Sequence, residues 1–278
     1  MDEAQPSLNP PRLAKSIPGI RQSLTLGALY LALYIAVTLA FQIAHVPLGM
    51  FWSLLVVQVI AWPLILWIGL RWSRVSFREA CPLTRFPVRI VPALLIVSFG
   101  ATILLLAGAG LIPMPEAMEK GLTESITGSS RLSLFFSVVL GAPLGEELFF
   151  RGWVLRGYLG RYSAGKAVWA SAILFALFHL NPWQAVVALP LGLAFAWLFL
   201  RTGSLLPGIL GHATVNFSTN FLLSPLALAL GYNDDAMKAL GHFPTSMLAL
   251  GGAMAIIGGL ILWRQLAGFS PLSQATPQ

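Results

Sequence analysis

The chain has 278 residues, of which 57% are hydrophobic and 10% are charged. Soluble domains carry about 25% charged residues, so this composition excludes an ordinary soluble domain and indicates a membrane protein. The net charge of +7 does not indicate a nucleic-acid partner, because basic residues beside apolar segments are explained by membrane topology. A single cysteine, Cys81, excludes an intrachain disulfide and a Cys-x-x-Cys motif, and we expect it to be inert.

The first 21 residues are polar and contain prolines, without the short apolar core of a cleavable signal, and we expect them to be a cytoplasmic tail. Charges and Pro/Gly breaks divide the rest into about eight apolar segments, each near the ~20 residues that cross a bilayer. These segments are residues 22–44, 50–70, 90–112, 132–157, 167–181, 183–200, 204–230 and 246–263. The sequence therefore predicts an all-α, polytopic transmembrane bundle over residues 22–263, followed by a cytoplasmic tail at 264–278.

The distribution of basic residues predicts the orientation of this bundle. Eight spans place both termini on one side, and with that side in the cytosol 14 of the 17 basic residues become cytoplasmic. Only Lys120, Arg131 and Lys238 lie on the opposite side, as the positive-inside rule requires. The fifth and sixth segments are short and meet at Asn181-Pro182, so they could also form a re-entrant pair.

Two adjacent acidic residues lie inside the apolar run of residues 132–158, whereas the other eight acidic residues fall in predicted tails or loops. An ionisable group in a membrane helix costs at least ~2.5 kcal/mol and indicates a functional site. Glu147 and Arg151 are four residues apart and can form an ion pair on one helix face. Glu146 points about 100° away from this pair and needs a partner from another helix.

Two other predicted spans provide such partners. Phe175 and His179 are four residues apart on the fifth span, and His212 and Asn216 are four residues apart on the seventh. Each pair therefore shares one helix face. These polar groups can lie level with Glu146 only if the fourth helix continues to about residue 158; a helix that ended at residue 151 would leave Glu146 about 10 Å too shallow.

In these residues the sequence resembles the CAAX protease and bacteriocin-processing (CPBP) family, which includes the type II CAAX prenyl endopeptidases. Three motifs of that family, Glu-Glu-x-x-x-Arg, Phe-x-x-x-His and His-x-x-x-Asn, are present in order on separate spans within residues 130–220. They stand here as Glu146-Glu147-Leu148-Phe149-Phe150-Arg151, Phe175-Ala176-Leu177-Phe178-His179 and His212-Ala213-Thr214-Val215-Asn216.

The resemblance implies an intramembrane peptidase core at about residues 130–220. In similar proteins, the residues corresponding to Glu146 and His179 activate a water molecule that attacks the scissile carbonyl. Those corresponding to His212 and Asn216 stabilise the oxyanion that results. The supporting residues are then Glu147 and Arg151, which hold the architecture, and Phe175, which packs beside the site.

The sequence is compatible with two mechanisms, one that uses zinc and one that uses no metal. Glu146, His179 and His212 could bind zinc with one open position, since Glu/His/His sets occur in zinc enzymes. We favour a mechanism without a metal or other cofactor, because no His-Glu-x-x-His motif is present and an asparagine is useful in an oxyanion site but not to zinc. The absence of Gly-x-Ser-x-Gly disfavours a serine nucleophile.

The expected substrate is a peptide or protein with a prenylated or membrane-proximal C-terminal tail, reached from the cytosolic side of a lipid bilayer. We expect a multi-pass protein of a bacterial cytoplasmic membrane, because loops and tails are short. A proton-coupled transporter is the main alternative, since buried Glu and His residues also form proton relays. A non-catalytic membrane scaffold is the second.

Overall fold

The computed structural model describes residues 18–45, 50–116, 118, 120, 129–223 and 243–269. Every regular element with printed bounds in these ranges is helical, which confirms the predicted all-α class. In chain order they are α1 (Ile20–Ile43), α2 (Met50–Ser73), α3 (Phe77–Ala80), η1 (Val88–Ile90), α4 (Val91–Gly110), α6 (Arg131–Leu134), η2 (Phe135–Gly141), α7 (Ala142–Glu147), η3 (Leu148–Leu155), α8 (Arg156–Leu159), α9 (Ala164–Phe178), α10 (Pro182–Thr202), α11 (Leu206–Phe217), η4 (Ser218–Leu222) and α14 (Thr245–Leu266).

Six helices in the described ranges are long and apolar enough to cross a membrane, which supports a multi-pass membrane protein. They are Ile20–Ile43, Trp52–Ser73, Val88–Gly110, Arg131–Leu159, Pro182–Thr202 and Thr245–Leu266. The predicted fifth span corresponds to α9, which has 15 residues, and the seventh to α11, which has 12 and continues into η4. The number of eight spans and the orientation therefore stay predictions, and residues 224–230 of the seventh lie outside the described ranges.

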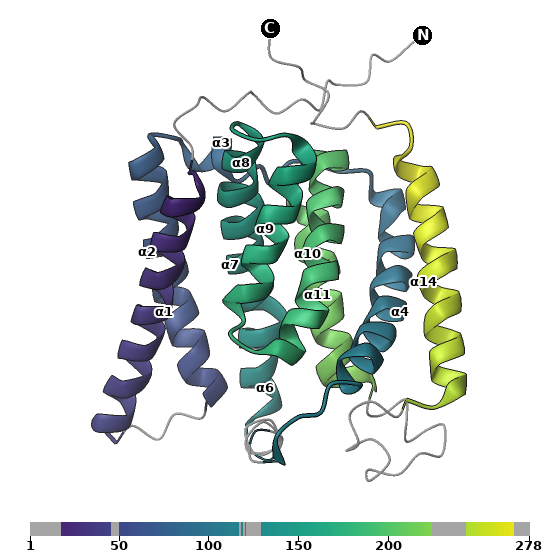
Figure 1. Cartoon of the computed structure of the whole chain (residues 1–278), viewed down its shortest axis with the longest axis horizontal. Helices are drawn as coiled ribbons and strands as arrows, with labels where there is room; N and C mark the ends of the chain where they lie inside the picture. The colour runs from purple at the N-terminus through teal and green to yellow at the C-terminus, as the bar shows by residue number, and fades with distance from the viewer. Residues whose placement is uncertain are drawn as a thin grey trace, which may run out of the picture.

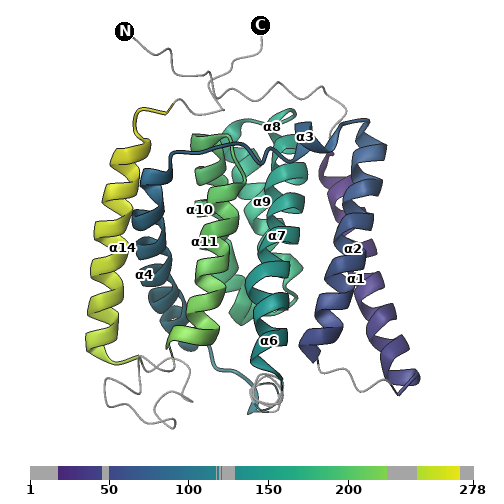
Figure 2. The same ribbon diagram turned by 180° about the vertical axis from the view of Figure 1, so that it is seen from behind.

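The helices run roughly alongside one another, with α1 and α2 at one edge of the bundle and α4 and α14 at the other (Figure 1). Residues 131–159, called the fourth helix below, occupy the centre with α9, α10 and α11. Figure 2 shows the fourth helix nearer to the viewer than α9, whereas Figure 1 shows the opposite side. The segments that carry the three motifs are therefore neighbours in the middle of the bundle.

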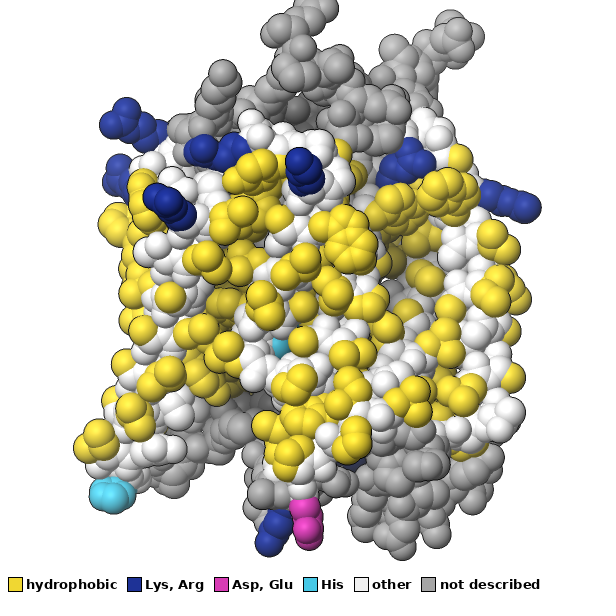
Figure 3. All heavy atoms as spheres, viewed as in Figure 1, with side chains coloured by type: hydrophobic (Ala, Val, Ile, Leu, Met, Phe, Trp, Pro, Cys, Tyr) yellow, Lys and Arg dark blue, Asp and Glu magenta, His cyan; other side chains and the backbone are white. Residues whose placement is uncertain are grey.

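The surface is polarised along the helix axes. Lys and Arg side chains gather at one end of the face seen in Figure 3, and the broad band beside them is mostly hydrophobic. Exposed apolar side chains such as Ile35, Trp67 and Ile256 are more than half exposed to the surroundings, as expected where lipid replaces water. The pattern fits a bundle with its apolar band in a bilayer.

The fourth helix is continuous from Arg131 to Leu159, which confirms the expectation that it passes residue 151. Two of its stretches, η2 and η3, are π-helical, and Ala142 N–H donates to the Ser137 carbonyl across such a turn. Wide π turns leave backbone carbonyls available for other partners, and they occur frequently at functional sites. The sequence pattern predicted a continuous helix but not these wide turns.

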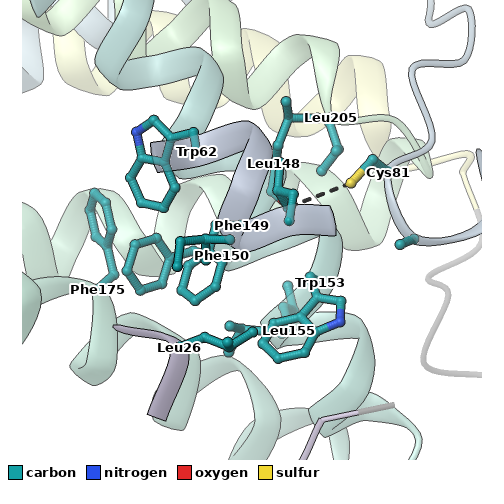
Figure 4. Close-up of a cluster of buried hydrophobic side chains, with 14 of the residues drawn as sticks. Leu26, Trp62, Cys81, Leu148, Phe149, Phe150, Trp153, Leu155, Phe175 and Leu205 are labelled. Atoms are coloured by element: carbon teal, nitrogen blue, oxygen red, sulfur yellow. Dashed lines mark hydrogen bonds between the residues drawn. The ribbon is translucent and has the colours of Figure 1, made fainter. Parts of the chain in front are cut away.

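Aromatic side chains fill the core between the fourth helix and its neighbours. Phe149, Phe150 and Phe175 lie close together in Figure 4, and the Phe150 and Phe175 ring centroids are 5.1 Å apart at 75°. Trp62 of α2 stacks on Tyr30 of α1 with 4.1 Å between centroids. These large rings exclude water from the middle of the bundle and fix the fourth helix against α2 and α9.

Candidate active site

Four charged or polar side chains from two helices form one buried cluster at the middle of the bundle. Glu146 and Glu147 end α7, Arg151 lies one turn later in η3, and His212 lies in α11. Glu147, Arg151 and His212 are each at most 5% exposed. The helical spacing predicted the Glu147–Arg151 pair, and the structure contains it, with 2.6 Å between Glu147 Oε1 and Arg151 Nη1.

Glu147 also contacts His212, and the sequence did not predict this contact. His212 Nδ1 lies 3.1 Å from Glu147 Oε1, the same oxygen that accepts from Arg151. His212 Nε2 lies 3.8 Å from Glu146 Oε2, beyond hydrogen-bond distance. The imidazole of His212 therefore lies between two glutamates that are adjacent in the sequence.

Glu146 keeps an unused acceptor. Its side chain is 17% exposed, and its Oε2 atom is buried without a hydrogen-bond partner among the described residues. A buried polar atom without a partner is unusual in a folded protein and calls for a ligand, a water molecule or a catalytic role. Glu147 Oε2 likewise lacks a hydrogen-bond partner among the described residues, and Glu147 differs from Glu146 in the ion pair that its Oε1 atom makes with Arg151.

Aromatic rings surround the charged cluster. Phe195 of α10 stacks on His212, with 5.4 Å between ring centroids, and Phe175 meets the same imidazole edge-on at 5.9 Å. The Arg151 guanidinium lies 4.3 Å from the Phe175 centroid and 5.4 Å from that of Phe195, within range of cation–π attraction. Phe175 was expected to pack beside the site, and it touches both ionisable partners of Glu147.

His179 lies at the edge of the cluster. It is the C-cap residue directly after α9, and its Nδ1 atom lies 2.9 Å from the carbonyl oxygen of Phe175 in that helix. Its ring also meets the Phe175 ring edge-on at 5.0 Å. No ion pair or hydrogen bond between His179 and Glu146 is found in the described part of the chain, so the structure brings His212, and not His179, into direct range of Glu146.

Asn216 connects α11 to the fourth helix. Its Nδ2 atom donates to the Val138 carbonyl at 2.8 Å, and Val138 lies in the π-helical stretch η2. Asn216 follows His212 by one turn, and Val138 precedes Glu146 by about two, so the two helices are antiparallel here. This contact uses one of the two amide hydrogens of Asn216.

Comparison with known protein families matches residues 128–218 to the family described as Rce1-like, type II CAAX prenyl endopeptidase. The chain carries an Rce1-like endopeptidase domain. All three motifs lie inside the matched segment, so the resemblance to the CPBP family and the prediction of a peptidase are confirmed. The Rce1-like match leaves α1, α2, α4 and α14 outside it. No curated protein and no solved structure gave a match.

The alternative zinc set of Glu146, His179 and His212 does not fit this geometry. Within the described ranges, no group of three or more His, Cys, Asp or Glu side chains converges on a point that could hold a metal ion. His212 Nε2 and Glu146 Oε2 lie 3.8 Å apart, and no ion pair or hydrogen bond joins His179 to either of them among the described residues. The reaction proposed below therefore uses no metal.

Sequence reasoning missed two residues of the site. Phe195 gave no signal, because an aromatic residue in an apolar span is ordinary and its contact with His212 joins separate helices. Gly208 could have been noticed, since it lies one turn before His212 on the same face of α11. A Cβ atom at Gly208 would come within 3.1 Å of Glu147 Oε2, so the glycine leaves room for the carboxylate.

Proposed function

We propose that this protein is an intramembrane endopeptidase that hydrolyses a peptide bond near the C-terminus of a lipidated, CAAX-type or other membrane-associated protein or peptide. The observation that carries the proposal is the buried cluster of Glu146, Glu147, Arg151 and His212 inside the Rce1-like segment. Ionisable groups inside a membrane are costly and mark functional sites. The role of Glu146 as the general base is supported by its unused Oε2 atom on a side chain that is 17% exposed, whereas the side chain of Glu147 is 1% exposed and paired with Arg151.

In the proposed reaction, Glu146 takes a proton from a water molecule, with His179 assisting, and the water oxygen attacks the scissile carbonyl carbon. His212 and Asn216 stabilise the oxyanion, and each such donor contributes about 3 kcal/mol when it is aimed in advance at the developing charge. The carbon–nitrogen bond then breaks, and the proton held by Glu146 passes to the leaving amine. Phe175 and Phe195 keep bulk water away from the charged groups.

We further propose that the end of the bundle rich in Lys and Arg faces the cytosol, and that the substrate tail reaches the site from that side. The support is the positive-inside rule together with the basic end seen in Figure 3. Under this proposal, residues 22–263 form one transmembrane unit with its peptidase core at 130–220. A bacterial cytoplasmic membrane is the proposed location, because the loops between spans are short.

The test compares cleavage of prenylated and unprenylated CAAX peptides by the purified protein and by Glu146→Gln. We expect the variant to lose at least about 100-fold in kcat while its thermal midpoint stays near that of the wild type, since general-base catalysis contributes roughly 10²–10⁴-fold. The matched control is Glu116→Gln, which changes an exposed glutamate at one end of the bundle. His179→Ala in the same assay tests the assisting role of that side chain.

Three results would contradict the proposal. Cleavage by Glu146→Gln at the wild-type rate would rule out Glu146 as the general base. A wild-type protein that cleaves none of these peptides but carries proton-coupled solute flux in vesicles would favour the transporter. Loss of activity with a chelator that zinc restores would replace the metal-free mechanism.

A further inference from the structure

Glu147 has a second partner that its ion pair with Arg151 does not explain. Its Oε1 atom accepts from Arg151 Nη1 at 2.6 Å and faces His212 Nδ1 at 3.1 Å. A second guanidinium nitrogen, Arg151 Nη2, donates to the Gly192 carbonyl of α10 at 3.3 Å. Arg151 thus connects the Glu147 carboxylate to α10. The Oε1 atom that accepts from Arg151 also contacts His212 of α11.

The orientation of the His212 ring is determined from several sides. Phe195 stacks on its face at an interplanar angle of 22°, and Phe175 meets it at 89°. With both ring contacts in place, the hydrogen bond to Glu147 selects which edge of the imidazole points inward. His212 Nε2 then faces Glu146 Oε2 at 3.8 Å, next to the atoms where hydrolysis would occur.

The contact with Glu147 determines that His212 Nδ1 carries a hydrogen. An ionised carboxylate can only accept hydrogen bonds, so the hydrogen shared with Glu147 must be carried by His212 Nδ1. The oxyanion role proposed for His212 needs a second hydrogen, on Nε2, and the hydrogen bond from Nδ1 to Glu147 directs that Nε2–H group towards the reacting atoms. Without Glu147 the ring would lose this fixed direction beside Glu146.

We propose that Glu147 is a positioning residue, which accepts a hydrogen bond from His212 Nδ1 and thereby directs the Nε2–H group of His212 at the reacting atoms beside Glu146. This inference rests on the proposed peptidase function and goes beyond an architectural ion pair. Arg151 contributes by fixing the position of Glu147. The two adjacent glutamates thus have separate tasks, because Glu146 acts on water and Glu147 acts through His212.

The experiment separates positioning from architecture by removing both charges together. Replacing a buried ion pair with apolar residues of similar size is often neutral for stability, whereas removing one partner leaves a buried charge unpaired. Glu147→Met/Arg151→Met therefore keeps the fold and removes the acceptor for His212. Glu147→Gln/Arg151→Met is the matched variant, since it is also uncharged but keeps an acceptor oxygen.

We expect both double variants to keep a thermal midpoint near the wild-type value. Glu147→Met/Arg151→Met should lose on the order of 100-fold in kcat on a farnesylated CAAX peptide, the scale seen when the group that orients a functional histidine is lost. KM should stay within about twofold of the wild-type value. Glu147→Gln/Arg151→Met should recover most of the lost kcat. Equal activity of the Met/Met variant and the wild type would overturn the proposal.

A second readout does not depend on turnover. In protein labelled with ¹⁵N-histidine, with His212→Phe used to assign the signal, we expect a hydrogen-bonded Nδ1–H signal from His212 in the wild type and loss of that hydrogen-bonded signal in the Met/Met variant. A signal that is the same in both proteins would overturn the positioning role. Because the spectrum needs no substrate, a wild type without peptidase activity would contradict the proposed function alone.

Discussion

At the residue scale, Cys81 shows how burial controls reactivity. The side chain is 1% exposed, and its Sγ atom donates to the Leu148 carbonyl at 3.5 Å, as the dashed line in Figure 4 indicates. Burial raises the pKa of the Cys81 thiol from 9.0 to about 12, and nearby Arg156 opposes this only in part. The thiolate is the reactive form of cysteine, so the expectation of an inert side chain now has a physical basis.

We predict that native protein at pH 8 reacts with a maleimide roughly 1,000-fold more slowly than a free thiol, because the pKa of Cys81 rises from 9.0 to about 12. Unfolding in detergent should restore labelling of Cys81, which can be followed by mass spectrometry. Between about pH 9 and pH 12 the unfolded chain releases this proton and the folded chain keeps it, so stability should fall as pH rises there. Rapid labelling of the native protein would contradict the burial of this thiol.

Also at the residue scale, the two motif histidines differ in how close they lie to Glu146. The motifs named His179 and His212 equally, but only His212 comes within 3.8 Å of Glu146. His179 caps the C-terminus of α9, and its Nδ1 atom faces the Phe175 carbonyl. Spacing within a helix predicts which residues share a face, and it does not predict how far that face lies from a face on another helix.

At the element scale, backbone carbonyls in the π-helical stretches of the fourth helix accept hydrogen bonds from the side chains of three neighbouring segments. The carbonyl of Val138 accepts from Asn216, that of Leu148 from Cys81, and that of Phe150 from Ser171. Backbone groups in a membrane must be satisfied within the protein, because lipid offers no partners. The wide turns therefore tie α11, the segment after α3, and α9 to one central helix.

A second element-scale feature is the close contact of α2 with the fourth helix, which we call the α2 seam. It consists of Gln58 and Trp62 on α2 and of Gly141 and Gly145 on the fourth helix. A Cβ atom at Gly145 would overlap the Trp62 indole, and one at Gly141 would overlap the Gln58 side chain. Small residues in this arrangement let two helices approach closely in a membrane.

We predict that Gly145→Ala lowers the stability of the purified protein by about 1–3 kcal/mol, because overpacking forces the indole to move. The matched control is Gly252→Ala in α14, where a Cβ atom would meet nothing within 4 Å. That substitution should stay within about 0.5 kcal/mol or stabilise slightly, since alanine favours helix over glycine. Thermal midpoints in detergent measure both changes, and equal midpoints for the two variants would contradict the close contact at the α2 seam.

At the scale of the whole molecule, charge sits at the ends of the bundle and apolar surface between them. Arg71 and Arg264 lie in the last turns of α2 and α14, and Arg201 in that of α10. Lys166 belongs to the first turn of α9, at the same end of the antiparallel arrangement. This asymmetry is the physical basis of the proposed orientation.

The orientation can be tested with single cysteines, because the native thiol is expected to stay silent. Ser163→Cys places a thiol between α8 and α9, and Leu111→Cys places one after α4, where the native leucine is 79% exposed. In intact cells or spheroplasts, a membrane-impermeant maleimide should label position 111 and should label position 163 only after permeabilisation. The reverse pattern would invert the proposed topology, and the wild type provides the unlabelled control.

The sequence by itself determined the all-α class, the continuous fourth helix, the Glu147–Arg151 pair and the membership of the matched segment in a peptidase family. Each of these depends on periodicity, hydrophobicity or motif spacing along one stretch of chain. Tertiary structure alone decided that His212 lies between two glutamates, that Phe195 stacks on it, and that π-helical carbonyls bind other helices. These contacts join residues far apart in sequence, so they depend on how the helices pack, which local spacing does not encode.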